Sequence, residues 1–146
     1  MILGAALAAL AWLVASASGL PIDPFLPVVI ALGLHREWPN WARVVLAIAL
    51  APLAAAACGD VAAERVAVYA VAVMGSVNLS DWFDDGVVTR TGFAACALTA
   101  VLVVREVMHW AGSMPQGSDS LVSIAATVAW VAIHAALCLV LARRRP

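Results

Sequence analysis

The sequence contains no lysine, and charged residues make up only 12% of its 146 residues. All eight basic residues are arginines, and they are scattered along the chain except for the C-terminal run Arg143-Arg144-Arg145. The formal net charge is −1. Because a nucleic-acid-binding protein needs a basic face that neutralises phosphates, this distribution excludes nucleic acid as a partner.

Motifs for catalysis and metal binding are scarce as well. The three cysteines, Cys58, Cys96 and Cys138, stand singly within apolar runs, without the paired spacing of a zinc site or a disulfide framework. We expect them to be small buried hydrophobic residues. The chain also has no Ser/His/Asp arrangement, no phosphate-binding glycine loop and no His-Glu metal motif. We therefore predict a protein that is not an enzyme and that uses no cofactor or metal ion.

Hydrophobic residues, by contrast, are abundant. They make up 65% of the chain, and the mean hydropathy is +1.02. Soluble domains are near half apolar and a quarter charged. A soluble domain of this length leaves roughly a third of its unfolded surface exposed, and this chain lacks the polar residues to cover it. The composition predicts an all-α integral membrane protein.

Long apolar segments divide the chain. A helix needs about 20 apolar residues to cross a hydrocarbon layer about 30 Å thick. Five segments approach that length, and the short connections between them predict a single transmembrane domain over residues 1–146. The first could be a signal peptide, but it lacks a basic n-region, which favours a membrane span. The five candidate spans are residues 2–20, 41–58, 61–79, 91–112 and 120–142.

A sixth apolar segment, residues 24–34, is shorter than the others. It carries Pro24 and Pro27 at its start, where a missing amide donor is tolerated in the first turn of a helix. This segment either crosses the membrane obliquely or enters and returns. The chain is therefore predicted to form a bundle of five to six transmembrane helices, and the side of the N-terminus depends on this segment.

The arginines predict the orientation of the bundle. If the C-terminal arginines are cytoplasmic, the loops that carry Arg36, Arg43 and Arg90 are cytoplasmic too. Only Arg65 and Arg105 then lie toward the outside, as the positive-inside rule favours. We expect a multi-pass protein with a cytoplasmic C-terminus.

The densest polar feature is the loop at residues 80–90. Its Asp81, Asp84 and Asp85 could bind Mg²⁺ and a diphosphate, and Asp85-Gly86 followed by Arg90 resembles the first half of the CDP-alcohol phosphatidyltransferase signature. The later glycine and two aspartates of that signature are absent, because Thr99, Val103 and Val107 stand at their positions. A phospholipid-synthesis enzyme that uses this loop remains an alternative, but an Asp-Gly turn with aromatic interface anchors is favoured.

Ionisable residues inside apolar segments are candidates for polar or partner contacts. In the fifth span, Arg105 and His109 are one helical turn apart, and Glu106 lies beside them; Arg105 is close enough to the outer end to reach the interface instead. In the last span, His134 shares a face with Trp130 and Cys138. We expect His134 to be a hydrogen-bonded packing residue, with metal binding or proton transfer as the alternative.

Two stretches carry a resemblance to a known family. Residues 22–36 read IDPFLPVVIALGLHR, an aspartate before an apolar run that ends in small and basic residues. Gly59-Asp60 closes the next span, and a helix containing Tyr69 follows. These features resemble the second and third segments of the rod-shape-determining MreD family, which the length, the number of spans and the basic C-terminus also fit.

The resemblance implies a function. The chain would be a non-catalytic scaffold subunit of the cell-elongation machinery in the bacterial inner membrane. It would bind an MreC-like bitopic subunit and help to organise peptidoglycan synthases. Asp23 and Asp60 would match the polar positions of the family.

A third possibility is a small-solute binding component of a transporter. That function needs a polar central pocket, and central polar residues are few: Asn78, Thr99, Thr127 and His134.

Overall fold

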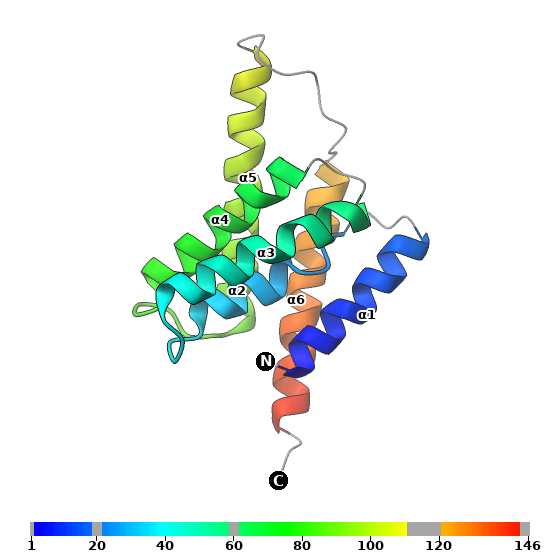
Figure 1. The fold of residues 1–146 in the computed structure, drawn as a ribbon. Coiled ribbons are helices and arrows are strands. Elements are labelled where there is room, and N and C mark those ends of the chain that lie inside the picture. The colour runs from blue at the N-terminus through cyan, green and yellow to red at the C-terminus, as the bar shows by residue number, and fades with distance from the viewer. Residues whose placement is uncertain (1, 19–21, 59–61, 111–120, 144–146) are drawn as a thin grey trace.

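The computed structural model describes residues 2–18, 22–58, 62–110 and 121–143, apart from a few side chains inside the helices. The described chain is all-helical and forms six helices (Figure 1). They are α1 (Ile2–Ser18), α2 (Leu26–Leu34), α3 (Asn40–Cys58), α4 (Ala62–Leu79), α5 (Val87–Trp110) and α6 (Leu121–Arg143).

The five long helices coincide with the five long apolar segments to within a few residues. The largest difference is at α5, which begins at Val87 and not at Thr91. The turn in which the Gly86 amide bonds the Asp84 carbonyl (2.8 Å) leads directly into this helix, so that Thr91 lies one turn inside it and bonds the Val87 carbonyl. Val87-Val88 are apolar residues that extend the helix toward the loop.

The sixth segment is a helix of nine residues, α2, preceded by a short non-helical stretch in which Asp23 and Pro24 are buried. Pro24 lies before the helix and Pro27 in its first turn, where neither lacks a needed helical hydrogen bond. At 1.5 Å per residue α2 is only about 14 Å long. The prediction that this segment is shorter than the others is confirmed.

Contacts at both ends of α2 show that it crosses the bundle. Its start lies beside the first turns of α4 and α6, where Asp23 bonds Arg65 and Thr127. Its end lies against the last turns of α4 and the start of α3, since Gly33 approaches Ser76 and Arg43 bonds the Gly33 carbonyl. The chain therefore reverses direction at every connection, and α1 begins at the end of the bundle where α6 finishes (Figure 1).

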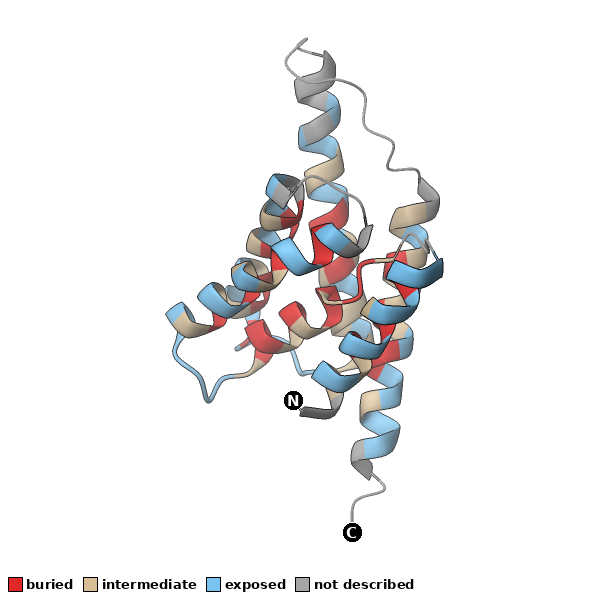
Figure 2. Ribbon diagram, turned by 45° about the vertical axis from the view of Figure 1, so that its right-hand side comes forward, coloured by how far each residue is buried: buried red, intermediate tan, exposed pale blue. Residues whose placement is uncertain are grey.

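Helix α2 is also the centre of the core. Seven of its nine residues are buried, and several of these belong to one hydrophobic cluster with buried alanines of α3, α4 and α5. The buried parts of the ribbon lie in the middle of the molecule (Figure 2). Small residues let helix backbones approach closely, which is how helices associate in lipid. The closest approach is at Gly33, where an added Cβ would stand 1.9 Å from the Ser76 Oγ. The fully buried small residues around α2 are Ala47, Ala51, Ala54, Ala72, Ala94 and Ala97.

Candidate functional site

The main polar site of the described chain is built around the Asp23 side chain, which is completely buried. Its Oδ1 accepts hydrogen bonds from the backbone amides of Phe25 and Leu26, both at 3.0 Å. These amides belong to the start of α2, where the first turn has no helical partners for its N–H groups. Asp23 thus caps the short helix and places a negative charge at its positive end.

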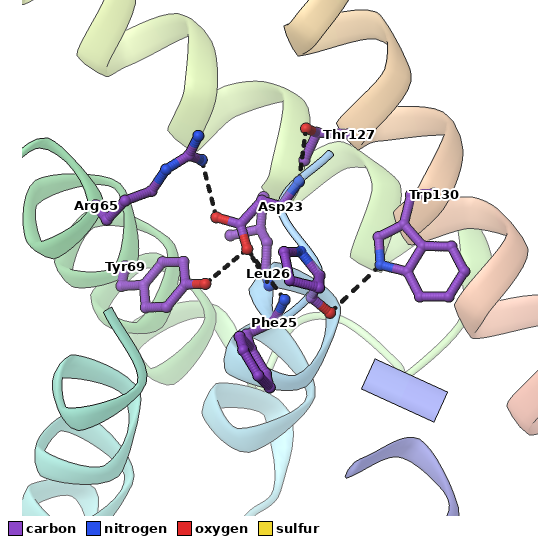
Figure 3. A network of polar contacts seen from close by, with 8 residues as sticks. Asp23, Phe25, Leu26, Arg65, Tyr69, Thr127 and Trp130 are labelled. Atoms are coloured by element: carbon purple, nitrogen blue, oxygen red, sulfur yellow. Dashed lines mark hydrogen bonds and ion pairs between the residues drawn. The ribbon is translucent and has the colours of Figure 1, made fainter. Parts of the chain in front are cut away.

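Helix α4 supplies the charge that balances Asp23. The Arg65 Nη1 donates to Oδ2 at 2.9 Å, and the Tyr69 hydroxyl, one turn further along, donates to Oδ1 at 2.6 Å (Figure 3). The whole Arg65 residue is 7% exposed, and Tyr69 is fully buried. Because a buried carboxylate is very costly unless it is paired and hydrogen-bonded, these two donors are what allows Asp23 to lie in the core.

Side chains of helix α6 bond the backbone of the same stretch, at residues 23 and 24. The Asp23 amide donates to the Thr127 Oγ1 at 3.1 Å, and the Trp130 Nε1 donates to the Pro24 carbonyl at 3.4 Å. Thr127 and Trp130 lie three residues apart and so face the same side of α6. We call Asp23, Arg65, Tyr69 and Thr127 the Asp23 network.

The Asp23 network joins α2, α4 and α6, and both oxygens of its carboxylate accept bonds from donors of the chain itself. Oδ1 accepts three hydrogen bonds and Oδ2 accepts the bond from Arg65. A general base or a metal ligand needs a lone pair directed at a substrate or an ion. The arrangement is therefore suited to fixing α2 between α4 and α6.

His134 is a second buried polar residue, one helical turn beyond Trp130 on α6. Its Nε2 lies 3.0 Å from the Gly4 carbonyl of α1, and its Nδ1 lies 3.8 Å from the Cys138 Sγ. The Trp130 ring meets the imidazole edge-on, with centroids 5.7 Å apart. His134 thus links α6 to α1 through the contact with Gly4, while Trp130 of its own helix packs against the ring.

The aspartate-rich loop is exposed, and its Asp81 and Asp85 carboxylates are paired with arginines of the chain. Arg90 forms a bidentate pair with Asp85, at 2.5 and 2.7 Å. Arg36 bonds the Ser80 carbonyl and lies 3.9 Å from the Asp81 carboxylate. In the part of the chain that the structure describes, no three His, Cys, Asp or Glu side chains come together in a group that could hold a metal ion.

The remaining candidate residues are not brought together with the Asp23 network. Glu106 is exposed on α5. Asp60 and the side chains of Arg105 and His109 lie outside the described residues. Sequence reasoning singled out Asp23 but missed Arg65 and Tyr69 as its partners. A signal was present, because an arginine and a tyrosine one turn apart in an apolar helix need an acceptor, and Asp23 stands in the preceding apolar region.

The chain was compared with protein-family models, with curated proteins and with solved structures. None of the three comparisons gave a significant match. The function is therefore argued from the chain's own sequence and geometry.

Proposed function

We propose that the chain is a multi-pass membrane protein that acts by packing against other membrane proteins. The observation that carries this proposal is the exposure of its apolar helices. Two windows are long and apolar enough to cross a membrane, Val87–Val104 and Ser123–Leu141, and only 17% and 22% of them are buried. The core helix of a soluble protein would also be apolar, but it would be mostly buried.

Exposed side chains on the other helices support the same proposal. Leu10, Leu13, Val45 and Leu53 are each about half exposed, on α1 and α3. Full burial of such a side chain stabilises a protein by about 1.5–3 kcal/mol. In water, this stabilisation would be lost in part at each of the exposed positions. Contact with lipid removes this penalty.

Within this class, we propose a non-catalytic scaffold subunit of the cell-elongation machinery in the bacterial inner membrane, with a bitopic MreC-like partner and cell-wall synthases. The resemblance of residues 22–36 to the MreD family supports it, and so does the role of Asp23, whose carboxylate is occupied by the chain's own donors. A scaffold needs a fixed shape with an apolar outer surface. The Asp23 network provides such a fixed centre.

The test has two steps. Membranes from cells that express the tagged chain are washed at alkaline pH, and the chain is then purified in a mild detergent. We expect it to stay in the membrane pellet and to copurify with a single-pass membrane protein in a fixed ratio. Recovery in the soluble fraction would refute the membrane assignment, and purification without any partner from its native host would refute the scaffold.

The enzyme alternative is tested by the same preparation. Asp85→Asn removes a carboxylate that the phosphatidyltransferase hypothesis requires. Asp23→Asn instead alters the Asp23 network in the core of the bundle. We expect Asp85→Asn to leave partner recovery unchanged. Mg²⁺-dependent transfer of a lipid phosphate group by the wild-type chain, abolished by Asp85→Asn, would replace the scaffold proposal by the enzyme.

A further inference from the structure

Two loops lie together at one end of the bundle and carry an unusual set of exposed aromatic side chains. The α2–α3 loop and the start of α3 contribute Trp38 and Trp41, and the α4–α5 loop contributes Trp82 and Phe83. We call these four residues the aromatic rim. Trp41 is 71% exposed and Trp82 is 82% exposed, although both are among the largest apolar side chains in the protein.

The loops that carry the aromatic rim are held in place by polar contacts. Arg36 in the first loop bonds the Ser80 carbonyl in the second. Arg90 fixes Asp85 bidentately, and Phe83 packs edge-on against Phe93 of α5, with ring centroids 6.0 Å apart. These contacts fix the conformation of the two loops. The indoles are therefore exposed by a defined loop structure.

The aromatic rim lies at a boundary of the molecular surface. On one side are the exposed apolar flanks of the helices, such as Val45 on α3 and Leu79 at the end of α4. On the other are the charged side chains of the loops, with Glu37 and Asp81 each 84% exposed. An indole has an apolar body and one N–H donor, so it is favoured where hydrocarbon meets lipid headgroups.

The charges around the aromatic rim indicate which headgroups it fits. The arginines of the two loops and of the helix starts beside them are bonded to the chain. Arg36 is 56% exposed but bonds the Ser80 carbonyl and lies 3.9 Å from the Asp81 carboxylate. Arg43 bonds the Trp38 and Gly33 carbonyls, and Arg90 bonds Asp85. Anionic lipids are bound by basic clusters that are open to the surface. Exposed carboxylates and indole faces instead attract the ammonium group of a zwitterionic lipid.

We infer that the aromatic rim is a lipid-binding surface that seats this end of the bundle in a layer of zwitterionic headgroups. The inference rests on the proposed membrane location and adds the position of the interface and the class of lipid. It also sets the depth of the Asp23 network. Arg65 is fourteen residues before Leu79 on α4, which places it about 21 Å along the helix from the rim.

The test uses indole fluorescence of the full chain in phosphatidylcholine vesicles whose acyl chains carry bromine at a shallow or a deep carbon. We expect the shallow bromine to quench more strongly, and the double variant W41F/W82F to lose most of that shallow quenching. The matched control is Trp130→Phe, which removes an indole half-buried against Pro24; it should leave the shallow quenching in place. Unchanged helicity of each variant shows that the fold is kept.

Several results would overturn the inference. If aqueous iodide, and not brominated lipid, quenches the emission that W41F/W82F removes, the rim lies in water. If replacing phosphatidylcholine by phosphatidylglycerol strengthens the shallow quenching, the assigned headgroup class is wrong. Shielding of the rim indoles only after a second membrane protein is added would assign the surface to a protein partner.

The failure of the inference is separable from the failure of the proposed function. A chain that stays in the vesicles through an alkaline wash, with its rim indoles open to iodide, contradicts only the lipid-binding surface. A chain that is released by the wash contradicts the membrane assignment on which the inference rests.

Discussion

Arg65 and Asp23 form an ion pair in the core of the bundle, with the guanidinium Nη1 2.9 Å from the carboxylate Oδ2. The two side chains are 9% and 0% exposed. They come from residues 42 positions apart, and the contact joins the start of α2 to the first turn of α4. Because a buried carboxylate is costly unless it is paired, the pair makes the position of α2 depend on α4.

The first prediction concerns this ion pair. Asp23→Asn removes the carboxylate charge that Arg65 bonds in the core, and breaking a buried pair costs about 3–5 kcal/mol. We expect a large fall in the unfolding midpoint, measured by circular dichroism in detergent. The control is Asp81→Asn at the exposed pair with Arg36, which should change the midpoint little. Equal midpoints for the two variants would contradict a structural role for Asp23.

The second prediction isolates the Tyr69 hydroxyl. Tyr69→Phe keeps the ring in the core and removes the donor that bonds Oδ1 at 2.6 Å. Hydrogen bonds to a charged group are worth about 1.5–3 kcal/mol, so the free energy of unfolding should fall by roughly that amount. Thr91→Val is the control, because the Thr91 hydroxyl only bonds the carbonyl of Val87 on its own helix. A Tyr69→Phe protein as stable as wild type would show that the hydroxyl is dispensable.

The third prediction tests the close crossing of α2 and α4. A Cβ at Gly33 would meet the Ser76 Oγ at 1.9 Å and the Ser76 Cβ at 2.7 Å, so Gly33→Ala must push the helices apart. We expect a loss of about 1–3 kcal/mol, the usual cost of overpacking a core. The double variant G33A/S76G removes the obstructing side chain and should recover part of that loss.

Gly92 provides the matched control for Gly33. It also lies within a helix, but a Cβ there would have no neighbour within 4 Å. Gly92→Ala should therefore stabilise α5 slightly, through helix propensity. If Gly33→Ala were as harmless as Gly92→Ala, the two helices would not be in the contact that the structure describes.

The sequence predicts the helices of this protein better than it predicts their neighbours. Apolar runs locate the five long helices, and Pro24 and Pro27 explain why α2 is short. The helices are apolar on nearly all sides, so the periodicity that marks the inward face of a soluble helix is absent. The partners of Asp23 are 42, 46 and 104 residues away along the chain, and no local pattern encodes such pairings.

Asp23 illustrates the difference. The resemblance to the MreD family is what makes Asp23 a candidate polar contact, and its bonds to the amides of Phe25 and Leu26 are local enough to be anticipated from capping rules. For Arg65, by contrast, the sequence predicts only a place toward the outside, by the positive-inside rule. Only the packing of α2 beside α4 brings its guanidinium to the carboxylate.

The fourth prediction concerns the topology that α2 determines. Because α2 runs from the end where α4 and α6 begin to the end where α4 finishes, the chain passes through the bundle six times. If the bundle spans a membrane, a reporter fused before α1 and one fused after α6 should lie on the same side. By the positive-inside rule that side is cytoplasmic. A reporter inserted between α5 and α6 should lie on the opposite side and serves as the control. Finding the two end reporters on opposite sides would mean that α2 enters and returns, and the contacts of Gly33 with Ser76 and Arg43 would then have to be absent in the membrane.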